Sequence, residues 1–232
     1  MASFLRRDNV LLAAMAREDF AQIEAHLTLV ELPLKQYLSV ANQPIGHVYF
    51  VQSGIVSIVA QSDERRQIEV GIVGREGFSG FPLILGAGQS ANQEYVQVAG
   101  TAFRMPTADF LRAVAALPLF RGLLLCYVHI FMTQISQSML AVGNDHVAPR
   151  LARWLLMCHD RIQAPMLPLT HEFLAIMLSV RRAGVTESLH ELEVDKLIRA
   201  RRGLITILDR DRLLAFAGAS YGIPEQEYKR LI

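Results

Sequence analysis

The spacing of apolar positions changes twice along the chain and divides it into three regions. Residues 9–27 repeat apolar positions at helical intervals, with charged residues between them, so we expect one amphipathic helix. From residue 29 to about 105, short runs rich in β-branched and aromatic residues alternate with glycines. After Pro106 the helical spacing returns.

The middle region predicts a β domain. Its runs, such as HVYFVQSGIVSIVAQ and EYVQVAGTAFRMP, have the length and composition of short strands, and Ser53–Gly54 predicts a turn inside the first run. Several short strands with Gly-rich turns are typical of a jelly-roll sandwich, or double-stranded β-helix. The chain as a whole is therefore expected to be of the α+β class.

A long helix is expected from Pro118 to about Asn144. One of its faces carries a heptad pattern, formed by Leu125, Val128, Met132, Ile135, Met139 and Val142. A second apolar stripe occupies another face. A helix that is apolar on two faces needs two partners, so we expect it to pack on its own β domain and on a second copy of the chain. The alternative is a helix buried in a monomer core.

The segment 169–208 predicts a helix-turn-helix followed by a β-hairpin. Thr170 is a good N-cap, and apolar residues follow it with helical spacing for two turns. A tight break at Ser179–Val180 precedes a second helix, which begins near Arg181 and buries Val185, Leu189 and Leu192. A basic turn then leads into the strand LITIL.

This order fits the physics of DNA reading. The major groove admits one helix, whose N-terminal side chains reach the base edges, and arginines of a neighbouring hairpin can neutralise phosphates. The expected DNA-contacting residues are Thr170, Arg181, Arg182, Thr186, Glu187, His190, Arg199, Arg201 and Arg202.

Composition and charge narrow the class of protein. The net charge is +1, but residues 1–145 carry −2 and residues 146–232 carry +3, which weakly indicates an anionic partner at the C-terminal end. Two isolated cysteines, Cys126 and Cys158, suit a reducing compartment, and the N-terminus lacks the apolar core of a signal peptide. We expect a cytoplasmic protein with no membrane partner.

The sequence gives little support for an enzymatic function. The predicted strands offer only His47, whereas a metal cupin needs several histidines and a carboxylate. No phosphate loop, nucleophile elbow or Cys–His pair stands out, so no catalytic residue, metal site or cofactor is expected. A haem-ligand role for His47 or His129 is the alternative, but a lone histidine in an apolar segment is more often a core residue.

At this point the residues resemble the Crp/Fnr family of bacterial regulators over nearly the whole chain. VYFVQSGIVSI resembles its β-roll hairpin, and LTHEFLAIMLSVRRAGVTESLHELE with GLITIL resembles its winged helix-turn-helix. The resemblance implies a cyclic-nucleotide-binding-like sensor domain with its dimerisation helix (residues 1–144, helix 118–144) and a DNA-binding domain (145–232). It further implies a homodimer on a palindromic DNA site, with RNA polymerase as a further partner.

The chain departs from the family at both sites. Where many members read DNA with Arg-Glu-x-x-x-Arg, this chain has Arg182, Ala183 and Glu187, so its base preference is expected to differ. The matching effector-pocket positions are Gly80, Phe81, Gln93 and Glu94. Here Phe81 replaces the ribose-binding Glu, and Gln93 and Glu94 replace the phosphate-binding Arg-Ser pair.

A cyclic phosphate beside Glu94 without a cation is unfavourable, so we expect no control by cyclic AMP in the usual mode. Two alternatives stay open. One is a sensor of a small molecule or partner whose C-terminal domain no longer binds DNA. The other is a constitutive DNA-binding dimer without an effector.

Overall fold

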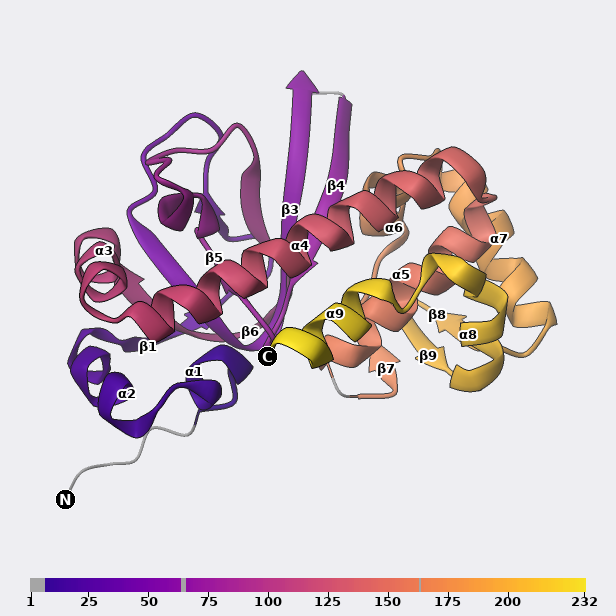
Figure 1. The fold of residues 1–232 in the computed structure, drawn as a ribbon. Coiled ribbons are helices and arrows are strands. Elements are labelled where there is room, and N and C mark those ends of the chain that lie inside the picture. The colour runs from indigo at the N-terminus through magenta and orange to yellow at the C-terminus, as the bar shows by residue number, and fades with distance from the viewer. Residues whose placement is uncertain (1–6, 64–65, 163) are drawn as a thin grey trace. The chain divides into compact units, whose positions relative to one another are not determined.

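The computed structural model describes residues 7–63, 66–162 and 164–232 (Figure 1). The chain forms two compact units. The first contains Met1–Ser57, Val73–His129 and Ile232, and the second contains Ile58–Ile72 and Ile130–Leu231. The division passes through two long strands and one long helix, so each unit holds part of these elements.

The N-terminal segment is helical, but it is broken into three pieces, where the sequence predicted one helix. These are α1 (Val10–Ala14), α2 (Arg17–Ile23) and the 3₁₀ turn η1 (Glu24–His26). Met15 and Ala16 adopt extended backbone angles between α1 and α2. Asn9 fixes the start of α1, because its side chain caps the helix and also donates from Nδ2 to the carbonyls of Val51 (2.9 Å) and Gly77 (2.7 Å).

A six-stranded sheet follows, which confirms the predicted β domain. The strands run in the order β1-β6-β3-β4, with β2 paired to β6 and β5 paired to β3. They are β1 (Thr28–Leu32), β2 (Tyr37–Ser39), β3 (His47–Asp63), β4 (Arg66–Val73), β5 (Phe78–Ser79) and β6 (Gln93–Pro106). The 3₁₀ helix η2 (Phe81–Leu85) lies between β5 and β6 in the chain.

The predicted turn at Ser53–Gly54 is wrong, because β3 continues through it for 17 residues. Gly54 adopts φ +86°, and a Cβ there would lie 2.4 Å from the carbonyl oxygen of Val98 in β6. On the other strand, a Cβ on Gly100 would lie 2.1 Å from the oxygen of Ser53. Two glycines thus let β3 and β6 approach closely, and Gly54 distorts the strand without reversing it.

An aromatic cluster forms the core of the first unit. Phe50 and Phe78 stack at 5.6 Å between ring centroids, and Phe78 lies 5.5 Å from Tyr127. Phe110 of α3 (Thr107–Ala116) and Phe120 of α4 (Pro118–Asn144) complete the group. The second apolar stripe of the long helix is therefore explained by packing on its own β domain.

The second unit holds the end of α4 and most of the C-terminal elements. Its helices are α5 (Val147–Ile162), α6 (His171–Leu178), α7 (Arg182–Val194), α8 (Arg210–Ala217), η3 (Gly218–Ser220) and α9 (Ile223–Leu231). A small sheet in the order β7-β9-β8 accompanies them, formed by β7 (Met166–Leu167), β8 (Ile198–Arg201) and β9 (Leu204–Ile207). Strands and helices are mixed as predicted, so the α+β class is confirmed.

The C-terminal tail, residues 218–232, has no clear role by its sequence, and in the structure it contacts α5 through Tyr221. Arg210 donates from Nη2 to Oδ1 of Asp160 at 2.8 Å, and the hydroxyl of Tyr221 donates to the other oxygen of the same carboxylate. Burial, and then the bonded carboxylate of Asp160, raises the pKa of Tyr221, so its hydroxyl stays protonated. The tail is therefore part of the second unit's fold.

By length and mean hydropathy, α4 could cross a membrane. This is weak evidence, because a core helix of a soluble protein passes the same test, and Phe120 and Tyr127 of α4 pack in the β domain's core.

Candidate nucleic-acid interface and sensor pocket

Helix α6 begins and ends where the sequence predicted. The hydroxyl of Thr170 accepts a hydrogen bond from the backbone N–H of Phe173 at 3.3 Å, as an N-cap should. The helix ends at Ser179, which adopts the left-handed conformation with φ +52° and ψ +46°. The apolar residues Phe173, Leu174, Met177 and Leu178 are buried. This buried face packs α6 against α5 and α7.

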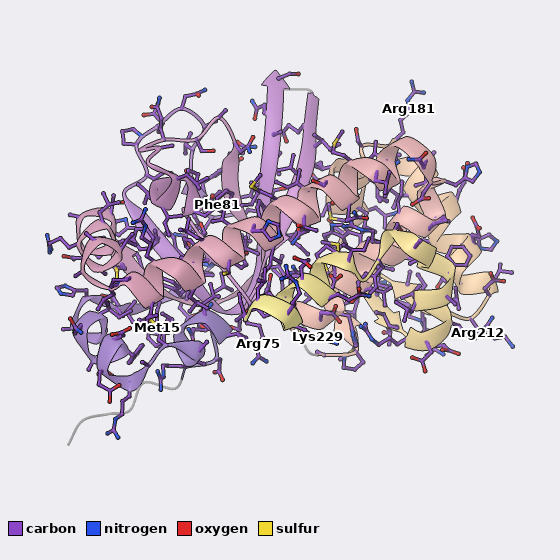
Figure 2. All side chains as sticks on the ribbon, viewed as in Figure 1. Met15, Arg75, Phe81, Arg181, Arg212 and Lys229 are labelled. Atoms are coloured by element: carbon purple, nitrogen blue, oxygen red, sulfur yellow. The ribbon has the colours of Figure 1, made fainter. Side chains whose placement is uncertain are left out.

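Helix α7 begins at Arg182, with Arg181 as its N-cap residue. Val185, Leu189 and Leu192 are buried, as predicted. The opposite face is exposed along its first two turns and carries Arg182, Ala183, Thr186, Glu187 and His190. Figure 2 shows the side chain of Arg181 projecting away from the ribbon at the start of this helix. The residues predicted to read base edges therefore share one accessible face.

Two polar contacts order this exposed face. The hydroxyl of Thr186 donates to the carbonyl of Arg182 at 3.1 Å, one turn earlier. The same hydroxyl lies 3.5 Å from Nδ1 of His171, the first residue of α6. Sequence reasoning did not include His171, which stands directly after the cap residue. The structure places it beside the reading face.

The β8–β9 hairpin forms the predicted wing. Its turn passes through Arg202 and Gly203, with φ +44° and +79°, and Arg199, Arg201 and Arg202 are exposed. Glu193 of α7 accepts from the backbone N–H of Ala200 at 2.7 Å, which fixes the hairpin to the second helix. A Cβ on Gly203 would lie 3.7 Å from the methyl group of Thr170, so the wing turn lies at the start of α6.

The arginines of this surface are not neutralised by the protein itself. Over residues 7–63, 66–162 and 164–232, no ion pair or hydrogen bond engages the guanidinium of Arg181, Arg182, Arg199, Arg201 or Arg202. Exposed guanidinium groups without carboxylate partners suit bidentate binding of phosphate or guanine edges. Glu187 is the acidic exception on the face, and it can accept from a cytosine amino group.

The predicted effector-pocket residues converge in part. Gly80 N–H donates to Oε2 of Glu94 at 3.1 Å, and the hydroxyl of Ser79 donates to the same carboxyl group. Glu94 is only 2% exposed, and burial raises its pKa, while the bonds from Ser79 and Gly80 oppose that shift. Gln93 is also buried, and Phe81 begins η2 and is half-buried.

The predicted dimerisation stripe is exposed in part. Leu125, Met132, Met139 and Val142 lie on the surface of α4, Ile135 is half-buried, and Val128 is only 4% exposed. Val128 packs within its own chain and is therefore not accessible to a second copy. The exposed apolar positions at 125, 132 and 139 keep the seven-residue period of a helix–helix seam.

Sequence reasoning missed a buried polar network in the C-terminal unit, formed around Gln134 and Arg153. Gln134 in α4 accepts from the N–H of Ile72 at 2.8 Å and donates to its carbonyl at 3.3 Å. Arg153 in α5 donates to the carbonyl of Ser220 at 2.7 Å and of Gln134 at 3.5 Å, and burial lowers its pKa to about 10. A glutamine and an arginine inside apolar helical stretches were the only local indication of it.

No group of three or more His, Cys, Asp or Glu residues that could hold a metal ion occurs in the part of the chain that the structure describes. Cys126 is half-buried, Cys158 is buried, and both are free thiols.

Comparisons with known families agree with this geometry. The chain matches the cyclic nucleotide-binding domain over residues 29–116 and the Crp-like helix-turn-helix domain over residues 149–216. The two matches together span more than half of the chain. None of the curated proteins matches the sequence.

Solved structures share the fold across both units. FixK2 from Bradyrhizobium japonicum has a TM-score of 0.72 at 16% identity, covering 83% of this chain and 98% of its own. The c-di-GMP-responsive regulator CLP from Xanthomonas campestris has a TM-score of 0.68 at 17% identity, covering 83% and 99%. A crp/fnr-family regulator from Eubacterium rectale has 0.66 at 19%, covering 91% and 99%.

At these identities the solved structures show the fold, and the two domain matches show the kind of protein. A cyclic nucleotide-binding domain precedes a Crp-like helix-turn-helix domain, inside the fold of solved crp/fnr regulators, so this chain is a transcription regulator that belongs to the Crp/Fnr family.

Proposed function

We propose that this protein is a homodimeric, sequence-specific DNA-binding regulator of the cytoplasm, in which residues 1–144 form the sensor domain and residues 145–232 read DNA. The observation that carries the proposal is the exposed face of α7, flanked by arginines without carboxylate partners on α7 and the wing. RNA polymerase is a further proposed partner.

The two parts of the surface have different proposed roles. Arg182, Thr186, Glu187 and His190 face outward from the first turns of α7, where side chains reach base edges in the major groove. Arg199, Arg201 and Arg202 on the wing bind phosphates, which adds affinity without sequence preference. Thr170 positions the start of α6 beside the wing turn. Glu187 in place of a second arginine gives a base preference different from that of the usual family site.

The dimer is proposed to form through the exposed seam of α4. Leu125, Met132 and Met139 recur at seven-residue intervals on the surface, and residues 122–144 contain no Asp, Glu, Lys or Arg. A solvent-facing helix without charged residues leaves apolar surface in water, and pairing with a second copy removes it. Two copies related by a two-fold axis would bind a palindromic site with half-sites about 34 Å apart.

Control by cyclic AMP in the usual mode is not part of the proposal. The matched pocket positions carry Phe81 and Gln93, and Glu94 engages Gly80 and Ser79. A cyclic phosphate brought to this carboxyl group would have no arginine to bind from the matched positions.

The test is a genome-fragment selection with the purified, ligand-free protein at about 0.15 M salt. Recovery of a two-fold symmetric motif is expected. Arg182→Ala is expected to cost about 1–3 kcal/mol on that motif and to relax one base position. Arg212→Ala is the matched control, because Arg212 is an exposed arginine on α8, away from Arg181 (Figure 2). Retention of no fragment, or equal losses for both variants, would overturn the DNA-reading proposal.

The dimer is tested separately by sedimentation. Met132→Asp places a charge in the seam and should shift the protein toward monomer and weaken DNA binding. Leu111→Asp is the control, because Leu111 is also an exposed apolar residue but lies on α3. An unchanged dimer in the Met132→Asp variant would show that the seam is misplaced.

A further inference from the structure

Glu94 is a buried acidic side chain that the proposed DNA reading does not use. It lies near the start of β6, it is 2% exposed, and its register partner on β2 is Ser39. Both of its oxygens face the segment at residues 79–80, where Oε2 lies 3.1 Å and Oε1 lies 3.4 Å from the backbone nitrogen of Gly80. The hydroxyl of Ser79, itself 1% exposed, donates to Oε2.

The two donors form a polar cradle, which we define as the hydroxyl of Ser79 and the N–H of Gly80. Gly80 has φ +87°, and a Cβ there would lie 3.1 Å from both the carbonyl oxygen of His47 and a methyl group of Val48. The cradle therefore requires glycine and is held close against β3. Its donors would be unsatisfied inside the domain if Glu94 were absent, at a cost of about 1–3 kcal/mol for each buried group.

The cradle is also the place at which the sequence places an effector pocket. Gly80 and Glu94 are two of the four positions matched to the nucleotide contacts of the family, and the structure joins them directly. A ligand that approached these donors would first have to displace the carboxyl group of Glu94. The carboxyl group of Glu94 thus accepts the two hydrogen bonds that a bound small molecule would have to accept in its absence.

We infer that the side chain of Glu94 is a built-in occupant of the polar cradle, so that the β-roll holds this segment in its folded form without a small molecule at that place. The inference rests on the proposed function, in which the protein binds DNA without a ligand in the cradle. It also defines what could replace the side chain, namely a small carboxylic acid or amide that fits the space left by truncation.

The test is chemical rescue of Glu94→Ala with acetate, which carries the carboxylate that the substitution removes, and with acetamide, whose carbonyl is a neutral acceptor. Thermal unfolding and binding to the selected DNA fragment are measured in parallel. The variant is expected to unfold at lower temperature and to bind DNA ~10-fold more weakly, a difference of about 1.4 kcal/mol. Acetate or acetamide should raise both values, because a ligand that binds the folded form stabilises it. Sodium chloride at equal ionic strength should not.

Three further variants separate the loss of the acceptor at position 94 from a general effect of the substitution. Glu94→Gln retains the acceptor and the shape, so it should show neither the losses of Glu94→Ala nor its response to the additives. Glu94→Asp withdraws the carboxyl group by one methylene and should show a smaller, additive-sensitive loss. If Glu94→Ala does not fold, Glu94→Asp carries the test. Glu31→Ala removes an exposed carboxylate on β1 and should change nothing.

The outcomes separate the two proposals. A wild-type protein that binds no DNA contradicts the proposed function, while the unfolding measurements still test the cradle. A Glu94→Ala variant that matches the wild type in both measurements, or a folded variant whose losses no additive restores, overturns the inference.

Discussion

The indole nitrogen of Trp154 donates to Oε1 of Glu69 over 2.6 Å, and this bond joins helix α5 to strand β4 within the C-terminal unit. Both residues are buried, with exposures of 6% and 8%. The bond lies in the same unit as the amide of Gln134, which engages both backbone groups of Ile72. Gly71 leaves room for the ring of Phe131, because a Cβ at position 71 would lie 2.7 Å from that ring.

Glu69→Ala is expected to destabilise this unit by about 1–3 kcal/mol, because it leaves the buried indole N–H of Trp154 without this acceptor. Urea unfolding followed by circular dichroism measures the loss. Trp154 is the only tryptophan of the chain, so its fluorescence reports the same region independently.

Glu69→Gln is the control for this prediction, because the amide oxygen can still accept from the indole. It should lose less than Glu69→Ala, and Trp154→Phe should reduce the difference between the two variants, as in a double-mutant cycle. Equal losses for alanine and glutamine at position 69 would show that the bond contributes nothing measurable.

A second prediction concerns the turn between the two helices of the DNA-binding motif. Ser179 is exposed and adopts the left-handed conformation, which costs a non-glycine residue about 1 kcal/mol. Ser179→Gly should therefore raise the free energy of unfolding by up to about 1 kcal/mol and leave DNA affinity unchanged. Ser179→Ala retains the strain and should give no gain. A destabilised glycine variant would mean that the serine contributes a contact that outweighs its strain.

The wing arginines should act through charge alone. Arg201→Ala and Arg202→Ala should each remove one of the proposed phosphate contacts, so each should reduce the slope of log K against log salt by about 1. The losses should be equal on the selected motif and on random DNA, in contrast to Arg182→Ala. Fluorescence anisotropy across a salt series measures both. A wing variant that loses affinity only on the motif would assign that arginine to base reading instead.

The sequence predicted the DNA-binding motif well because its determinants are local. Thr170 caps α6 through a residue three positions away, and the buried face of α7 follows from helical spacing. The turn predicted at Ser53–Gly54 failed because the conformation of Gly54 depends on Gly100, 46 residues along the chain, where β6 crosses β3. A glycine with positive φ marks either a turn or a close approach, and the sequence alone does not separate the two.

The contacts that the sequence did not predict at the candidate sites also join residues that lie apart in the chain. Trp154 and Glu69 are 85 residues apart, and neither stands in a local pattern that indicates the other. Glu94 was expected to repel a phosphate, but nothing in the sequence showed that its acceptors would be satisfied by Ser79 and Gly80. For α4, the heptad pattern included Val128, and only its burial within its own chain removes that residue from the exposed seam.

The last prediction is a pH dependence of stability that arises from Glu94. Burial raises the pKa of this carboxyl group above its ordinary value of 4.5, although the bonds from Ser79 and Gly80 partly oppose the shift. Glu94 also interacts electrostatically with Tyr49, and the side chain of Arg104 is hydrogen-bonded to that tyrosine. The folded state therefore holds the proton of Glu94 more tightly than the unfolded state does.

The sign of the effect follows from proton linkage. A group whose pKa is raised on folding contributes stability in full below its unfolded pKa, and the contribution is lost as the pH rises through the folded pKa. Wild-type stability should fall relative to Glu94→Gln as the pH rises from about 4.5, at up to about 1.4 kcal/mol per pH unit until Glu94 ionises in the fold. Urea unfolding of both proteins across this range measures the difference, in which the other carboxyl groups cancel. A difference that stays constant with pH would show that Glu94 titrates alike in the folded and unfolded chains.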